Sequence, residues 1–101
     1  MHFYVYILLC KNNSFYTGYT NNLQKRITTH FSGKGCKYTK SFPPHKLIAS
    51  FKLKNKSEAM SLESKIKALS RKEKELFISA PNSFGFHDVF QVITIEEIGI
   101  N

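Results

Sequence analysis

Residues 3–20 read FYVYILLCKNNSFYTGYT and predict an antiparallel β-hairpin. Residues 3–10 and 15–20 are rich in aromatic and β-branched side chains, which favour strands. The polar residues 11–14 between them are typical of a turn. The chain therefore begins with two neighbouring strands, on which the rest of the fold is expected to be built.

Helices are expected to cover this sheet. Asn21 or Asn22 caps a helix that runs to about Ser32, where Gly33 ends it. Three segments follow: a basic loop over residues 34–44, a third strand over residues 46–54 and a long helix over residues 57–69. Within the third strand, Ile48 breaks the alternation of apolar and polar side chains.

A last short helix is predicted from the residues that follow the long one. Ser70 and Glu73 have the spacing of a capping box, and the helix ends near Ser79. The expected fold class is α/β in its α+β form. It would consist of a small three-stranded antiparallel sheet flanked by helices.

The composition changes after Ser79, so residues 1–79 are expected to form the domain and residues 80–101 a C-terminal extension. Residues 80–85 read as a linker and residues 89–95 as an extra strand. The extension contains three acidic residues and no Lys or Arg. The extra strand would pack on the edge of this sheet or pair with a second copy in a homodimer. Alternatively, the acidic extension would screen the basic domain and weaken nucleic-acid binding.

The charge of the chain predicts a polyanionic partner. Its 15 Lys and Arg against 7 Asp and Glu give a formal net charge of +8. No carboxylate stands in residues 1–57, which contain ten cations. Lys and Arg bind nucleic acid by neutralising phosphates, so DNA is the first candidate. No segment is long enough to span a bilayer or reads as a basic amphipathic helix, so we expect no membrane contact and a cytoplasmic location.

The two cysteines, Cys10 and Cys36, lack the spacing of a metal-binding pair. We expect them to be reduced thiols, as is usual in a cytosolic protein. A zinc site that combines them with His30 or His45 is disfavoured, because structural zinc sites use closely paired ligands.

Arg26 and His30 are four residues apart and so would share one face of the first helix. A solvated surface pair explains this spacing as well. In the functional alternative, the planar guanidinium of Arg26 holds a phosphate. His30, titrating near neutrality, relays a proton. Lys25 adds a further cation beside Arg26.

Two tyrosines, Tyr6 and Tyr16, would lie near this helix. An unperturbed phenol has a pKa near 10 and needs nearby cations to act as a base at neutral pH. Gly18, without a side chain, would let a phosphate approach the backbone. The alternative for Tyr6 is a core ring with its hydroxyl at the sheet surface.

Glu63 is expected at the margin of the apolar stripe of the long helix rather than on its exposed face. One interpretation is a surface ion pair with Lys67, four residues further on. The other is a carboxylate that presents oxygen to Mg²⁺ or Mn²⁺, which bind through few carboxylates and keep most of their waters.

Together, Tyr4-Val5-Tyr6, Tyr16-Thr17-Gly18, the Arg26 and His30 pair and Glu63 resemble the GIY-YIG nuclease superfamily. Residues 33–40 and 59–67 are similar to its short, stand-alone bacterial members, the UPF0213-like group. The resemblance covers about residues 2–78. The chain departs from the family pattern at Tyr4, where glycine is usual, at Tyr19, where some members have lysine, and in lacking an obvious match to an asparagine after the metal glutamate.

The resemblance implies a metal-dependent endonuclease that hydrolyses DNA, with DNA repair or recombination as its setting. It implies five catalytic residues: Tyr6, Tyr16, Arg26, His30 and Glu63. Glu63 would bind one Mg²⁺ or Mn²⁺ ion, weakly until nucleic acid arrives.

Nucleic-acid contacts are expected around the basic loop. The residues concerned are Gly18, Lys25, Lys34, Lys37, Tyr38 and Lys40. The ring of Tyr38 would stack on a base, or would simply pack the loop. Two other functions stay open: a non-catalytic nucleic-acid-binding module on the same scaffold, and a protein-interaction domain.

Overall fold

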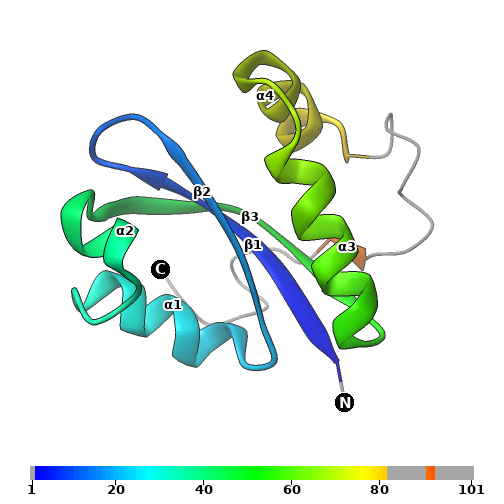
Figure 1. The fold of residues 1–101 in the computed structure, drawn as a ribbon, viewed down its shortest axis with the longest axis horizontal. Helices are drawn as coiled ribbons and strands as arrows, with labels where there is room; N and C mark the ends of the chain where they lie inside the picture. Colours follow the sequence, from blue (N-terminus) through cyan, green and yellow to red (C-terminus); the bar gives the residue numbers. More distant parts are fainter. Residues whose placement is uncertain (1, 82–90, 93–101) are drawn as a thin grey trace.

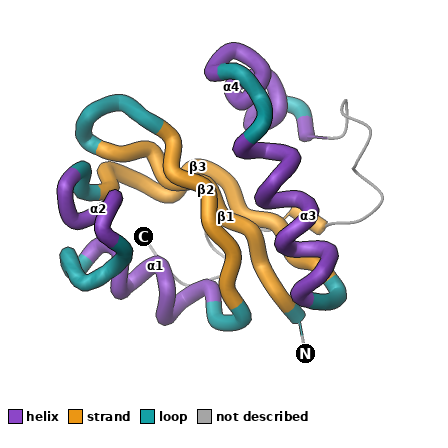
Figure 2. Tube along the Cα trace, viewed as in Figure 1, coloured by secondary structure: helices purple, strands orange, loops and turns teal. Residues whose placement is uncertain are grey.

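The computed structural model describes residues 2–81 and 91–92 (Figure 1). Its elements follow in the order β1 (Phe3–Cys10), β2 (Phe15–Thr20), α1 (Leu23–Phe31), α2 (Lys37–Ser41), β3 (Pro44–Leu53), α3 (Lys56–Lys67), α4 (Arg71–Ser79) and β4 (Gln91–Val92). The predicted α+β class is confirmed, with helices on both faces of an antiparallel sheet (Figure 2).

The sheet has the strand order β2-β1-β3-β4, and every neighbouring pair is antiparallel. Tyr6 in the central strand β1 lies opposite Gly18 of β2 and Ser50 of β3. The two residues of β4 pair with Phe51 and Lys52 of β3. They fall inside the predicted strand over residues 89–95, whose other members lie outside the described residues. Most of the predicted linker over residues 80–85 also lies outside the described residues.

The alternation of β1 side chains builds two cores. Val5 and Ile7 face α3 and α4 and pack with Leu62, Ile66 and Phe77. Tyr6 and Leu8 face α1 and pack with Leu23 and Ile27. Figure 1 shows α1 and α2 on one side of the sheet and α3 and α4 on the other. Tyr6 therefore points toward the α1 and α2 layer.

A register shift in β3 explains why Ile48 breaks the alternation. Ile7 lies opposite Ala49 and Leu8 opposite Leu47, so Ile48 is an extra residue between two pairs. Such a bulge re-aims the side chains that precede it. Leu47 consequently packs with Tyr6 on the α1 side, whereas Phe51 packs on the α3 side.

The helix caps agree largely with the predictions. Asn22, rather than Asn21, caps α1 by accepting a hydrogen bond from the backbone of Lys25. Ser70 and Glu73 form the predicted capping box of α4. Asn55 caps α3, which begins one residue before the predicted start.

The prediction of a continuous loop over residues 34–44 is wrong. It contains the five-residue helix α2, and β3 begins at Pro44 rather than at Lys46. A helix this short has too few residues for an apolar periodicity, and its N-cap, Cys36, makes no side-chain capping bond.

Among residues 2–81 and 91–92, no helix is long and apolar enough to cross a bilayer.

Candidate active site

A buried row of hydrogen bonds joins β1, α1 and α2. The hydroxyl of Tyr6 lies 2.8 Å from Nε2 of His30, and Nδ1 of His30 lies 2.8 Å from Oγ1 of Thr39. Tyr6 is 1% exposed, and both His30 and Thr39 are 0% exposed. The predicted pair of Tyr6 and His30 is therefore brought into direct contact, with Thr39 as a third member.

The direction of these hydrogen bonds follows from Thr39. Its hydroxyl donates to the backbone carbonyl of Cys36, at 3.3 Å. Since the hydroxyl has one proton, a Thr39 that donates to Cys36 accepts from His30, and on this basis we assign the imidazole proton to Nδ1. Nε2 is then the free acceptor, and Tyr6 donates to it. In this arrangement the phenol proton lies between the Tyr6 oxygen and Nε2 of His30.

Two glycines make room for this row. A Cβ at Gly18 would lie 2.5 Å from the Tyr6 hydroxyl oxygen, and one at Gly35 would collide with Nδ1 of His30 and Oγ1 of Thr39. The Tyr6 ring thus occupies the space above Gly18. This contact explains the glycine at residue 18 by the space that Tyr6 needs, whereas the prediction explained it by the close approach of a phosphate.

Arg26 lies beside the Tyr6 phenol. Burial raises the pKa of Tyr6 above its usual value, and hydrogen bonding and charge from the Arg26 guanidinium offset only part of that rise. Arg26 therefore favours the phenolate that proton transfer to His30 would create. It reaches this place from α1, one turn before His30, as the four-residue spacing predicted.

Burial makes His30 a neutral imidazole. Desolvation, and then the charge of Arg26, lower the pKa of His30 to about 4. The prediction that His30 titrates near neutrality is wrong, because burial of the ring lowers its pKa well below that range. At pH 7 the imidazole is unprotonated and available as a proton acceptor.

Tyr16 stands on the same face of the sheet, beside the row. Its ring centroid lies 6.4 Å from that of Tyr6 and 5.3 Å from that of His30. Burial, followed by a hydrogen bond to Cys36, raises the pKa of Tyr16. Burial alone would raise the pKa of the Cys36 thiol, but hydrogen bonds from Tyr16 and Thr39 lower it to about 7. Of the two tyrosines, Tyr6 is therefore the one with Arg26 and His30 at its hydroxyl, whereas the hydroxyl of Tyr16 lies near Cys36.

Glu63 approaches this site from the opposite layer. It lies beside the buried stripe of α3, with its side chain 18% exposed, and its charge is among the causes that raise the pKa of Tyr6. Its carboxylate also lies 3.5 Å from Nζ of Lys67, as the ion-pair interpretation predicted. Within the described part of the chain, no three His, Cys, Asp or Glu side chains form one cluster.

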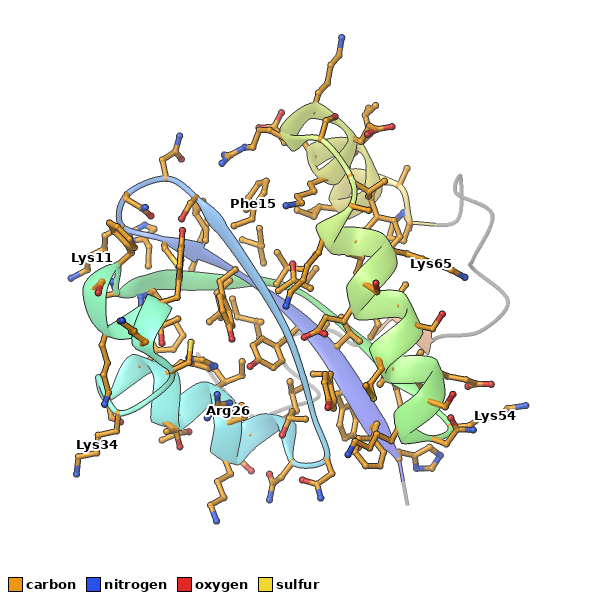
Figure 3. All side chains as sticks on the ribbon, in the orientation of Figure 1. Lys11, Phe15, Arg26, Lys34, Lys54 and Lys65 are labelled. Carbon is orange, nitrogen blue, oxygen red and sulfur yellow. The ribbon has the colours of Figure 1, made fainter. Side chains whose placement is uncertain are left out.

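The lysines predicted to contact nucleic acid lie on α1, on α2 and on the connection between them. Lys25 lies on α1, Lys34 on the connection to α2, and Lys37 and Lys40 on α2, all of them exposed. Figure 3 labels Lys34 and Arg26 on this side of the molecule. Tyr38 stacks on Tyr16 with ring centroids 5.6 Å apart, so it packs α2 against the sheet while staying 36% exposed.

Sequence reasoning missed Gly35, Cys36 and Thr39. All three lie in or beside α2, whose five residues have no apolar periodicity that would have placed Thr39 inward. The only signal was their position within the predicted basic loop over residues 34–44. Their contacts with His30 and Tyr16 depend on how α2 packs on α1 and β2.

Comparison with known proteins gives consistent results. Residues 2–76 match the family described as the GIY-YIG catalytic domain. The chain is 49% identical to the UPF0213 protein BH0048 of Halalkalibacterium halodurans, over 78% of this chain and 84% of that protein. It is 52% identical to the UPF0213 protein YazA of Bacillus subtilis, over 76% of this chain and 77% of that protein.

Two solution structures share the fold. That of BH0048, from Bacillus halodurans, has a TM-score of 0.53 at 49% identity and covers 78% of this chain and 84% of its own. That of EF2693, from E. faecalis, has a TM-score of 0.58 at 39% identity and covers 86% of this chain and 93% of its own.

Proposed function

The chain belongs to the GIY-YIG catalytic domain family, and from this membership and the geometry of the site we propose that it is a metal-dependent endonuclease acting on DNA. The observation that carries the proposal is the 2.8 Å contact between the Tyr6 hydroxyl and Nε2 of His30. A phenol with a neutral imidazole acceptor and a guanidinium beside it is arranged as a general base. The absence of carboxylates from residues 1–57 supports a phosphodiester as the substrate.

In this mechanism Tyr6 removes a proton from the attacking water. The phenol proton passes to Nε2 of His30, and the charge left on the phenolate is stabilised by Arg26. The guanidinium also suits the non-bridging oxygens of the phosphate, where negative charge develops.

Glu63 fits a role as a ligand of Mg²⁺ or Mn²⁺. Its carboxylate is partly exposed and offers the oxygen donors that these ions prefer. The bound ion would supply positive charge at the leaving oxygen. A single protein carboxylate gives weak affinity, so substrate phosphate is expected to complete the site.

The proposal is tested by the variant Glu63→Gln. Purified protein would be incubated with single-stranded, duplex, branched and damaged DNA, with and without Mn²⁺. We expect metal-dependent cleavage by the unaltered chain and none by Glu63→Gln, with DNA binding largely retained. The matched control is Glu75→Gln, which removes a carboxylate from another four-residue ion pair, that with Arg71 on α4. Equal cleavage by the unaltered chain and Glu63→Gln would refute the assignment and expose a contaminating nuclease.

A non-catalytic nucleic-acid-binding module is the second candidate. The observation in its favour is that Glu63 already pairs with Lys67, while Tyr6 is almost fully covered. It predicts salt-sensitive DNA binding, no cleavage in either metal, and indifference to Glu63→Gln. Three further expectations stay predictions: a role in DNA repair or recombination, a cytoplasmic location, and a homodimer formed through the extension.

A further inference from the structure

Four aromatic rings lead from the buried hydrogen-bond row to the surface of α2. The ring of His30 lies 5.3 Å from that of Tyr16, Tyr16 lies 5.6 Å from Tyr38, and Tyr38 lies 5.1 Å from Phe42. Exposure rises along this series, from 0% at His30 to 36% at Tyr38 and 40% at Phe42. We call Tyr16, Tyr38 and Phe42 the aromatic row. Its inner end lies in the site, and its outer end is open to solvent.

Tyr38 is held in place at both ends of its side chain. Its ring stacks on Tyr16 with an angle of 24° between the planes, and its hydroxyl contacts Oγ of Ser14 in the β1–β2 turn. A ring fixed in this way binds a ligand without a large loss of side-chain freedom. The middle ring of the aromatic row, Tyr38, is thus fixed in position.

Lysines flank the outer end of the aromatic row. Lys37 and Lys40 are exposed on α2 itself. Lys11 is exposed too, and its backbone nitrogen donates to the carbonyl of Pro43, the residue after Phe42. Figure 3 labels Lys11 and Lys34 on either side of α2. The exposed rings of Tyr38 and Phe42 thus lie among positively charged side chains.

We propose that α2 and the aromatic row bind single-stranded nucleic acid, with an unpaired base stacked on Phe42 beside Tyr38 and the adjacent phosphates on Lys37 and Lys40. The proposal rests on the proposed nuclease function and names its substrate class. Strand-binding proteins combine aromatic rings with cations that follow the backbone. In a duplex the faces of internal bases are covered by their neighbours, so exposed rings gain nothing from it. Since Tyr16, the inner end of the aromatic row, lies 5.3 Å from His30, a strand held on the row would pass beside Tyr6 and Arg26.

The test measures binding separately from cleavage. Fluorescence anisotropy would follow a labelled single strand and a duplex of equal length, with full-length protein carrying Glu63→Gln and without divalent metal. We expect the single strand to bind more tightly than the duplex at equal salt. Phe42→Leu keeps apolar bulk but removes the ring, and we expect it to weaken single-strand binding roughly five- to tenfold.

Matched controls separate stacking from packing. Phe31→Ala removes an exposed ring, 45% accessible, from the end of α1 outside the aromatic row, and we expect binding to stay unchanged. Phe42→Tyr should restore the single-strand affinity. Lys37→Ala should reduce the salt dependence of single-strand binding by about 0.7 in log–log slope, whereas Lys72→Ala on α4 should not.

Two results would overturn the proposal: equal or tighter binding of the duplex, or single-strand binding by Phe42→Leu that matches the parent protein. A single-strand preference without any cleavage by the unaltered chain would refute the nuclease function and leave this inference standing. Cleavage without a single-strand preference would refute this inference and leave the nuclease function standing.

Discussion

The phenol oxygen of Tyr6 and Nε2 of His30 lie 2.8 Å apart across 24 residues of sequence, inside a region that solvent does not reach. The contact pairs a proton donor with an imidazole that burial keeps neutral, because its pKa is lowered to about 4. The predictions below follow from this pair and from the residues that hold it.

Removing the Tyr6 hydroxyl should abolish most of the activity. Tyr6→Phe keeps the ring above Gly18 but leaves no group to pass a proton to His30. We expect cleavage to fall by about 10² to 10⁴, the usual contribution of a general base. The measurement is single-turnover cleavage at saturating metal.

Tyr4→Phe is the matched control, since Tyr4 is a partly buried tyrosine of the same strand that packs on the same core. It should cleave at the parental rate. A loss in Tyr16→Phe that exceeds the loss in Tyr6→Phe would move the role of base to Tyr16.

Thr39 should act as a positioning residue for His30. Thr39→Val has a similar shape but no hydroxyl, so Nδ1–H of His30 would lose its acceptor in the interior. An unsatisfied buried donor costs about 1–3 kcal/mol of stability. It would also free the imidazole to place its proton on Nε2, where it blocks transfer from Tyr6. We expect kcat to fall at least about tenfold, a part of the general-base contribution, with KM unchanged.

Thr39→Ser restores a hydroxyl and should recover both kcat and the parental pH–rate profile. If Thr39→Val and Thr39→Ser showed the same kcat and pH profile, the hydroxyl would have no part in positioning His30.

Stability should fall in acid because of His30. Its pKa is about 4 in the fold and near 6.5 in the unfolded chain, so below pH 6.5 the unfolded state takes up the proton first. The stability that the fold keeps by holding His30 neutral is fully present above pH 6.5 and is lost as the pH falls toward 4. From the size of this shift, we expect the free energy of unfolding to decrease by about 3 kcal/mol over that range.

Urea unfolding at a series of pH values measures this decrease in the free energy of unfolding. His30→Gln should flatten the curve between pH 6.5 and 4, whereas His45→Gln, at an exposed position of β3, should not. A parental curve that stays flat over this range would contradict the burial of a neutral His30.

A side chain at residue 18 should displace Tyr6. In Gly18→Ala the new Cβ would lie 2.5 Å from the Tyr6 oxygen, closer than two such atoms can approach. Overpacking of this kind costs about 1–3 kcal/mol. We expect cleavage to fall more than stability does, because the phenol itself has to move.

Thermal unfolding and cleavage by the same preparation measure both effects. Thr17→Ser, a change at the neighbouring buried position of β2, is the control and should affect cleavage little. Parental activity in Gly18→Ala would show that the phenol position is not critical.

Much of the fold could be predicted from local patterns. The hairpin over residues 3–20 and the capping box of Ser70 and Glu73 are confirmed, because alternation and capping depend on neighbouring residues alone. The short helix α2 was missed, since its five residues are held by tertiary packing. The irregular position of Ile48 was visible in the sequence, but its meaning as a bulge required the β1 partner strand.

The sequence by itself determined the strand pattern, the basic first half of the chain and the spaced motifs of the family. Only the tertiary structure decided that Tyr6, His30 and Thr39 form one buried row, since they come from β1, α1 and α2 and meet through register and helix packing. It also decided the protonation of His30, because a pKa depends on desolvation, which no spacing along the chain can reveal.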